Sequence, residues 1–132
     1  MIAPRLILLL CCLAFAGVAQ ETLDTLPPVV VKTVPAAGES KVDPAVKEIR
    51  VTFSKQMTTK QSWSMVTVKR AAFPKINGPL RFMADGRTFV APVKLDPGKT
   101  YALWINQDKF TGFRDAGNHP AVPYLLVFKT RE

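Results

Sequence analysis

The feature that most constrains the fold is a strict alternation of apolar and polar side chains within short segments. In residues 48–54, Ile49, Val51 and Phe53 fall on one face, and polar side chains fall on the other. A period of two with one polar face predicts a half-buried antiparallel strand. No stretch carries an apolar stripe with helical spacing over three turns. The chain is therefore predicted to be all-β.

Turn signals divide the sequence into about seven such segments. Asp85-Gly86 lies between two alternating runs and predicts a hairpin, and Pro97-Gly98 predicts the next turn. Strands are expected at 29–34, 48–54, 63–69, 80–83, 87–92, 100–105 and 122–130. Residues 71–79 and 109–120 are expected to be loops, and 55–61 to hold at most a short helical turn. Strands without crossover helices favour an antiparallel sandwich, with an up-and-down barrel as the alternative.

The first nineteen residues have the composition of a targeting segment. Arg5 precedes an apolar run at 6–15, and the small residues Gly17 and Ala19 follow it. This arrangement predicts a secretory signal peptide over residues 1–19. The run is shorter than the roughly 20 residues that cross a bilayer, although a retained anchor stays an alternative. Lipidation at Cys11 is a third possibility, but lipoprotein signals need a small residue where Leu10 stands.

Removal of that segment would leave 113 residues, enough for one domain with its own core. Residues 20–27 are predicted to be a short linker, and 28–131 the domain. The expected location is the periplasm, the cell surface or the medium. Contact with the membrane is expected only through the signal peptide before its cleavage. Both cysteines would leave with it, which excludes thiol catalysis and a cysteine metal site in the mature chain.

The charge is basic, with 18 Lys and Arg against 10 Asp and Glu and a net charge of +8. Such a charge attracts anionic surfaces, or it simply keeps a domain soluble. The cations are spread from Lys32 to Arg131 without a run of five or six, which favours the solvated surface. Export argues against nucleic acid as a partner.

Several motifs together resemble those of a known family. Residues 34–38 (VPAAG), 42–44 (VDP) and 49–57 resemble the opening of bacterial Ig-like domains of the S-layer type (SbsA-like). Residues 95–101, 114–118 and 128–130 resemble later elements of the same domains, so the resemblance covers roughly residues 28–130. It implies an immunoglobulin-like antiparallel β-sandwich in an exported or surface protein, without enzymatic activity. Such domains serve as spacers, adhesion modules or accessory domains, and a lone domain favours binding over spacing.

Six residues of these motifs are predicted to shape turns. Gly98 suits a turn position with positive φ, and Tyr101 is placed like a tyrosine-corner residue whose hydroxyl bonds nearby backbone. A side-chain-capped turn is expected around Asp115. The predicted structural set is Pro97, Gly98, Tyr101, Asp115, Gly117 and Asn118.

No catalytic, metal or cofactor site is predicted. His119 is the one histidine and has no serine near it in sequence, and no serine lies in a nucleophile-elbow setting. Asp108, Asp115 and Asn118 offer oxygens from one loop. Calcium takes six to eight oxygens, so turn capping is the favoured role of these side chains.

The candidate binding surface is an aromatic and basic stretch near residues 104–114. Trp104 alternates against the apolar face of its strand and is expected to point outward. Exposed rings beside cations suit a sugar or a protein partner, whereas rings folded inward would only cap the core. The predicted surface comprises Trp104, Lys109, Phe110, Phe113 and Arg114. The expected function is a module that binds a protein or an envelope polymer, and the alternative is a carbohydrate-binding accessory domain with an aromatic platform at 104–113.

Overall fold

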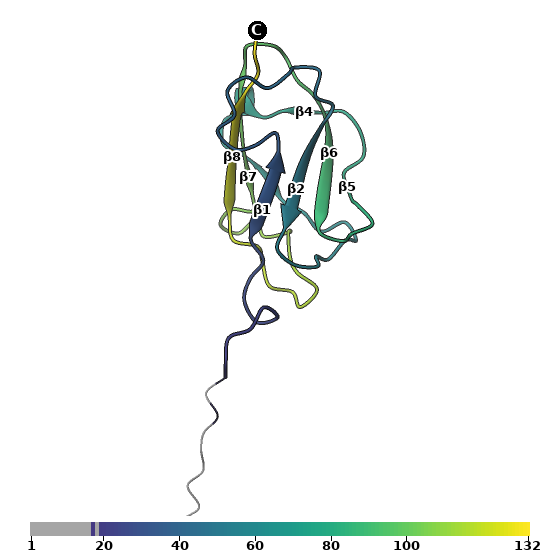
Figure 1. Ribbon diagram of the computed structural model, residues 1–132, viewed down its shortest axis with the longest axis vertical. Helices are drawn as coiled ribbons and strands as arrows, with labels where there is room; N and C mark the ends of the chain where they lie inside the picture. The colour runs from purple at the N-terminus through teal and green to yellow at the C-terminus, as the bar shows by residue number, and fades with distance from the viewer. Residues whose placement is uncertain (1–16, 18) are drawn as a thin grey trace, which may run out of the picture.

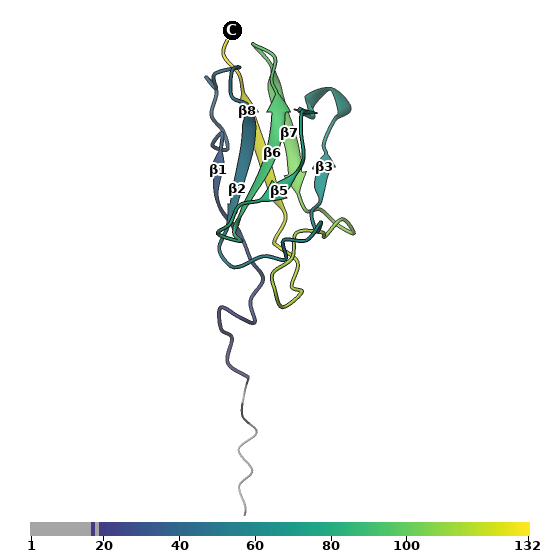
Figure 2. The same ribbon diagram turned by 90° about the vertical axis from the view of Figure 1, so that its right-hand side faces the viewer.

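The computed structural model describes residues 17 and 19–132, and almost all of the predicted signal peptide lies outside these residues. The described residues form eight strands and one 3-10 turn (Arg70–Ala72). The strands make two antiparallel sheets that pack as a sandwich (Figures 1 and 2). No helix forms at residues 55–61, so the short helical turn considered there is absent.

Sheet I contains five strands and sheet II contains three. The strands of sheet I are β1 (Val30–Val34), β2 (Glu48–Phe53), β4 (Lys75–Ile76), β5 (Arg81–Phe82) and β6 (Thr88–Lys94). Those of sheet II are β3 (Met65–Thr67), β7 (Thr100–Ile105) and β8 (Tyr124–Lys129). The order is β1-β2-β6 with β4 and β5 beyond β6, and β3-β7-β8 opposite. This is the ABED and CFG order of a constant-type immunoglobulin sandwich, which confirms the predicted fold class.

The eighth strand arises because one edge strand is divided in two. Both β4 and β5 pair with β6, and β4 lies in the segment that was predicted to be loop. The Asn77 N–H donates to the Pro92 carbonyl at 2.8 Å, so the ring nitrogen of Pro92 faces the same edge. That nitrogen has no hydrogen to donate, and the edge strand is interrupted opposite it.

The chain leaves sheet I after β1, and residues 38–42 then run alongside β8 of sheet II. The Gly38 N–H donates to the Val127 carbonyl at 2.7 Å, and the Lys129 N–H donates to the Glu39 carbonyl at 2.8 Å. Val42 then forms a parallel bridge with Thr130. This segment covers part of the outer edge of β8. An uncovered edge strand could pair with another chain, and the segment limits such pairing.

The core lies between the two sheets and consists of the inward halves of the alternating strands. Ile49, Val51 and Phe53 of β2 are all buried, as their alternation predicts. Tyr101 of β7 stacks on Phe128 of β8 with ring centroids 5.4 Å apart. Inward side chains from facing sheets therefore provide the packing on which the domain depends.

The long connections gather at one end of the sandwich. The β2–β3, β5–β6 and β7–β8 loops meet there, joined by bonds from the Met57 N–H to the Gly86 carbonyl and from the Thr58 N–H to the Arg114 carbonyl. The N-terminal segment extends from this end, and the C-terminus lies at the opposite end (Figure 1).

Candidate functional site

A buried carboxylate holds the loop end together. Asp115 is 1% exposed, and its carboxylate accepts a bond from the Lys55 ammonium at 2.6 Å. The His119 N–H donates to the same carboxylate at 2.8 Å, and the His119 ring nitrogen lies 3.0 Å from it. Burial alone raises the pKa of Asp115, but these bonds outweigh it and hold the pKa at about 2. The cluster therefore fixes the loops at this end of the sandwich.

Lys55 also ties the N-terminal segment to this end. Its ammonium donates to the carbonyl of Leu26 at 2.9 Å and to that of Asp24 at 3.3 Å. The side chain thus joins the incoming chain to the β7–β8 loop. Only tertiary contacts reveal this role, because Lys55 and Asp115 lie 60 positions apart.

Phe113 belongs to the core, which corrects its assignment to a binding surface. The side chain is 0% exposed and packs on Phe89 at 4.9 Å and on Phe53 at 5.2 Å between ring centroids. The cause is buried Asn106, whose side-chain amide donates to the Phe113 carbonyl at 2.8 Å and accepts from the Phe113 N–H at 3.0 Å. These bonds satisfy the loop backbone and turn the ring inward.

The other four predicted surface residues occupy separate environments. Trp104 is half-buried on the outer face of sheet II. Phe110 is 50% exposed where it closes a tight turn with Gln107, and the Lys109 ammonium lies 5.6 Å from its ring centre. Arg114 is tied within its own turn by bonds to the Thr111 carbonyl and hydroxyl at 2.8 and 2.7 Å. Of the predicted set, Trp104 and Phe110 are therefore the aromatic residues outside the core cluster.

The outer face of sheet II is apolar across all three strands. Val66, Trp104 and Leu125 form one row through the register of β3, β7 and β8. Ala102 and Val127 form the next row. None of these five side chains belongs to the core cluster between the sheets, and Leu125 is 40% exposed. The sheet thus presents a continuous apolar surface centred on an indole.

The outer face of sheet I has the opposite character. Lys32, Glu48 and Arg50 project there from β1 and β2, and Arg81 projects from β5 opposite Val90. Glu48 binds Arg50 and also lies 3.8 Å from Arg81. Charged side chains predominate on this face, which also carries exposed Val34 beside Arg50.

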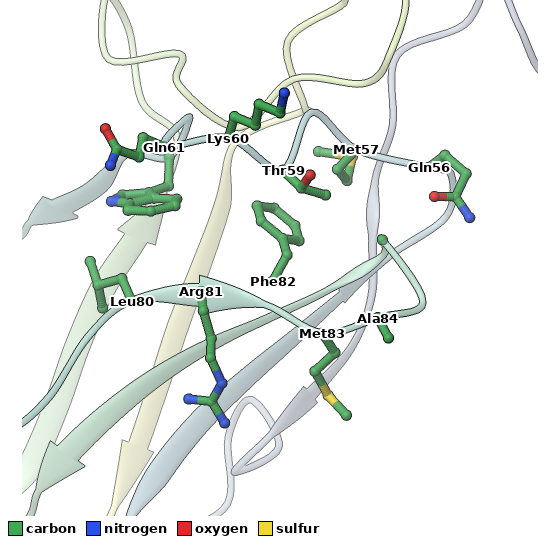
Figure 3. A pocket seen from close by; sticks show the side chains of 12 residues that line it. Gln56, Met57, Thr59, Lys60, Gln61, Leu80, Arg81, Phe82, Met83 and Ala84 are labelled. Carbon is green, nitrogen blue, oxygen red and sulfur yellow. The ribbon is translucent and has the colours of Figure 1, made fainter.

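A cleft of about 980 Å³ opens beside β5, between the β2–β3 loop and the β5–β6 turn. Phe82 points into it from β5, toward Thr59 of the loop (Figure 3). Trp63 and Leu80 add further apolar lining. The sequence did not reveal this cleft, because its two walls come from segments whose approach depends on the fold.

The predicted turn residues lie at two corners. The Tyr101 hydroxyl accepts a bond from the Asp96 N–H at 2.7 Å, which is the geometry of a tyrosine corner. Pro97 precedes Gly98, whose φ of +64° is the left-handed conformation that glycine adopts without strain. In the second corner the left-handed residue is Asn118, with φ of 68°, next to Gly117.

The residues described hold no group of three or more His, Cys, Asp or Glu side chains suited to a metal ion. The carboxylate of Asp85 accepts bonds from the Thr88 hydroxyl and from the N–H groups of Arg87 and Thr88, and these bonds lower the pKa of Asp85. Over the same part of the chain, no helix has the length and apolar character to cross a membrane.

The strand order and the tyrosine corner define an immunoglobulin-like sandwich, and comparison with known proteins shows its family. It belongs to the bacterial Ig-like domain family, whose sequence model matches residues 24–130. Among solved structures it is similar to the surface layer protein SbsC, domains 1-6, with 19% identity and a TM-score of 0.50. The match covers 80% of this chain and 14% of that one, and it shows the fold alone. No curated protein matches the chain.

Proposed function

We propose that this chain is an exported, non-catalytic interaction module of the bacterial cell envelope that binds a partner protein through the outer face of sheet II. The contrast between the two outer faces carries this proposal. Charged side chains predominate on one, whereas the other presents Val66, Trp104 and Leu125 in a row. A contiguous apolar area on a soluble domain marks an interaction site.

The chemistry of this face indicates what it would bind. Among the outward side chains of β7 and β8, Lys129 is the one that carries a charge, and it lies at one end of the face. A partner would present apolar side chains against Trp104 and a carboxylate near Lys129. Tryptophan at the centre of a desolvated patch is a frequent hot spot of binding energy.

The setting supports an envelope role. A similar solved structure is that of a surface layer protein with several domains. The amino-terminal 19 residues have the pattern of a secretory signal peptide. The matched family is one of Ig-like domains and indicates no enzyme.

A carbohydrate platform at 104–113 is the less favoured function. Such a platform needs several rings on one surface, and Phe113 is buried in the core. Trp104 lies on sheet II, while Phe110 closes a turn beyond β7 through mutual backbone bonds with Gln107. Of the three aromatic side chains in residues 104–113, that of Phe113 is therefore not available to a ligand at the surface.

Leu125→Glu tests the proposal with Lys32→Glu as its control. Both positions are exposed strand residues, but they lie on opposite outer faces. Binding of the purified domain to envelope fragments of its own bacterium would be measured at physiological salt. Leu125→Glu should weaken binding at least about tenfold, which corresponds to roughly 1.4 kcal/mol.

Lys32→Glu should leave binding unchanged, although it alters the net charge by two rather than one. Thermal unfolding would verify that both variants fold. Unchanged binding of Leu125→Glu, or an equal loss in both variants, would contradict the proposed surface.

A further inference from the structure

The cleft beside β5 combines features of a ligand site that the proposed protein interface does not use. Its lining includes the aromatic residues Trp63 and Phe82, the amides Gln56 and Gln61, and two cations, with no carboxylate among its residues. The net charge of the chain is +8. We infer that this cleft binds an acidic polysaccharide whose sugar rings carry carboxylates.

The aromatic lining is held in place before a ligand arrives. Phe82 packs edge-on against Phe89 with centroids 5.4 Å apart, and Trp63 packs on Phe89 at 5.5 Å. Phe89 itself is 0% exposed. Rings fixed against the core lose little conformational freedom on binding, and their flat apolar faces suit the C–H faces of sugar rings.

The backbone of β5 offers hydrogen bonds toward the cleft. The Met83 N–H donates to the Thr88 carbonyl at 2.8 Å, so Met83 turns its polar backbone toward β6. Because this direction alternates along an antiparallel strand, the N–H and C=O of Phe82 point away from β6. Sugar hydroxyls both donate and accept, and can therefore use this pair of groups together with ring stacking.

The opposite wall supplies polar side chains from an irregular loop. Gln61 has φ of 49°, an unusual left-handed conformation for a residue with a side chain. Gln61 and Thr59 line the cleft above Phe82 (Figure 3). Such backbone outliers cluster at binding sites, where surrounding structure holds them in place.

The two lining cations have different surroundings. Arg81 points to the side of β5 opposite Phe82, where Glu48 lies 3.8 Å away (Figure 3). Lys60 is exposed on the loop wall, and the ion pairs of the described chain do not include it. Its side chain extends from the loop on the side away from Phe82 (Figure 3), so Lys60 would meet a sugar carboxylate at the rim of the cleft. The cleft volume of about 980 Å³ is sufficient for a short oligosaccharide.

Oligogalacturonate and its methyl ester form a matched pair of probes, since they share a sugar backbone and differ in charge. Titration calorimetry on the full mature chain at physiological salt should show saturable binding of the acid. The methyl ester should bind roughly tenfold more weakly, as expected when a charge-assisted bond is lost. Equal affinity for both, or binding to neither, would overturn the inference.

Variants locate the binding in the cleft. Lys60→Gln should weaken binding of the acid roughly tenfold, whereas Lys69→Gln, which removes an exposed lysine outside the cleft, should change it less than about twofold. Phe82→Leu should remove stacking and weaken the acid and the ester alike. If Phe82→Leu does not fold, Gln61→Ala takes its place. Equal losses in Lys60→Gln and Lys69→Gln would show attraction to net charge only and would contradict a site.

Discussion

At the scale of single residues, Asp115 shows how one buried charge organises a loop end. Its carboxylate accepts bonds from the Lys55 ammonium and the His119 backbone, with side-chain exposures of 2% for Asp115 and 15% for Lys55. Removal of either partner from such a buried pair is strongly destabilising, because the other charge then stays buried without compensation. The sequence indicated a turn at Asp115 but not its partner, which comes from a distant loop.

Lys55→Met should therefore destabilise the domain. It leaves the Asp115 carboxylate buried without its cation and frees the carbonyl of Leu26. The free energy of unfolding should fall by about 3 kcal/mol, measured by urea denaturation. Lys69→Met, at an exposed position, should change it by less than about 0.5 kcal/mol. Equal stability of the two variants would contradict the role given to Lys55.

Tyr101→Phe tests the corner. The variant keeps the ring stacked on Phe128 but removes the acceptor of the Asp96 N–H. The expected loss is about 1 kcal/mol in the free energy of unfolding, the usual contribution of such a bond. Chemical denaturation of the two proteins side by side would measure it. A variant as stable as the parent would show that the hydroxyl is dispensable at this corner.

At the scale of elements, alternation located the strands because every second residue meets the core. β2 and β7 lie where the pattern placed them, within one residue. The division between β4 and β5 was not predictable, because it depends on which neighbour the nitrogen of Pro92 faces. That direction follows from the register of β6, which the sequence does not reveal.

The long β7–β8 loop was the least predictable element. Loop residues have no period, so nothing in the sequence distinguished buried Phe113 from exposed Phe110. The deciding contacts run from the amide of Asn106, at the end of β7, to the backbone of Phe113 and Ala121. The sequence shows that Asn106 follows a strand but not that it is buried, so its role in ordering the loop could not be predicted.

Gly112→Ala tests the packing of this loop. A Cβ at Gly112 would lie 2.5 Å from the backbone carbonyl oxygen of Trp63, so the loop or the start of β3 would have to move. The free energy of unfolding should fall by about 1–3 kcal/mol, as overpacking in a close contact costs. Thermal and urea unfolding would both report the change. No loss of stability would show that the loop shifts freely.

At the scale of the whole molecule, the acid response follows from Asp115. Its folded pKa of about 2 lies below the usual 3.8, so the charged form stabilises the fold above about pH 4. That contribution, roughly 2 kcal/mol, should be lost as the pH falls from about 4 to 2. Urea denaturation at several pH values would show this slope, and Asp115→Asn should flatten it. A slope that is the same in both proteins would assign acid sensitivity to other carboxylates.

The whole sandwich presents two unlike outer faces, one with charged side chains and one with an apolar row around Trp104. Alternation predicted that Trp104 points outward, but its neighbours Val66 and Leu125 became apparent only from the register of sheet II. This apolar face is the basis of the proposed interaction, while the cleft beside β5 is the separate site for which we inferred an acidic polysaccharide ligand.

The most direct test of the interaction surface is site-specific photo-crosslinking of the chain within its native envelope. A photoreactive amino acid at Leu125, at Val66 or at Lys32 would sample the two outer faces. We expect one adduct of the same mass, containing the same protein, from Leu125 and Val66, and none from Lys32. The same adduct from Lys32, or no adduct from the two positions on sheet II, would contradict it.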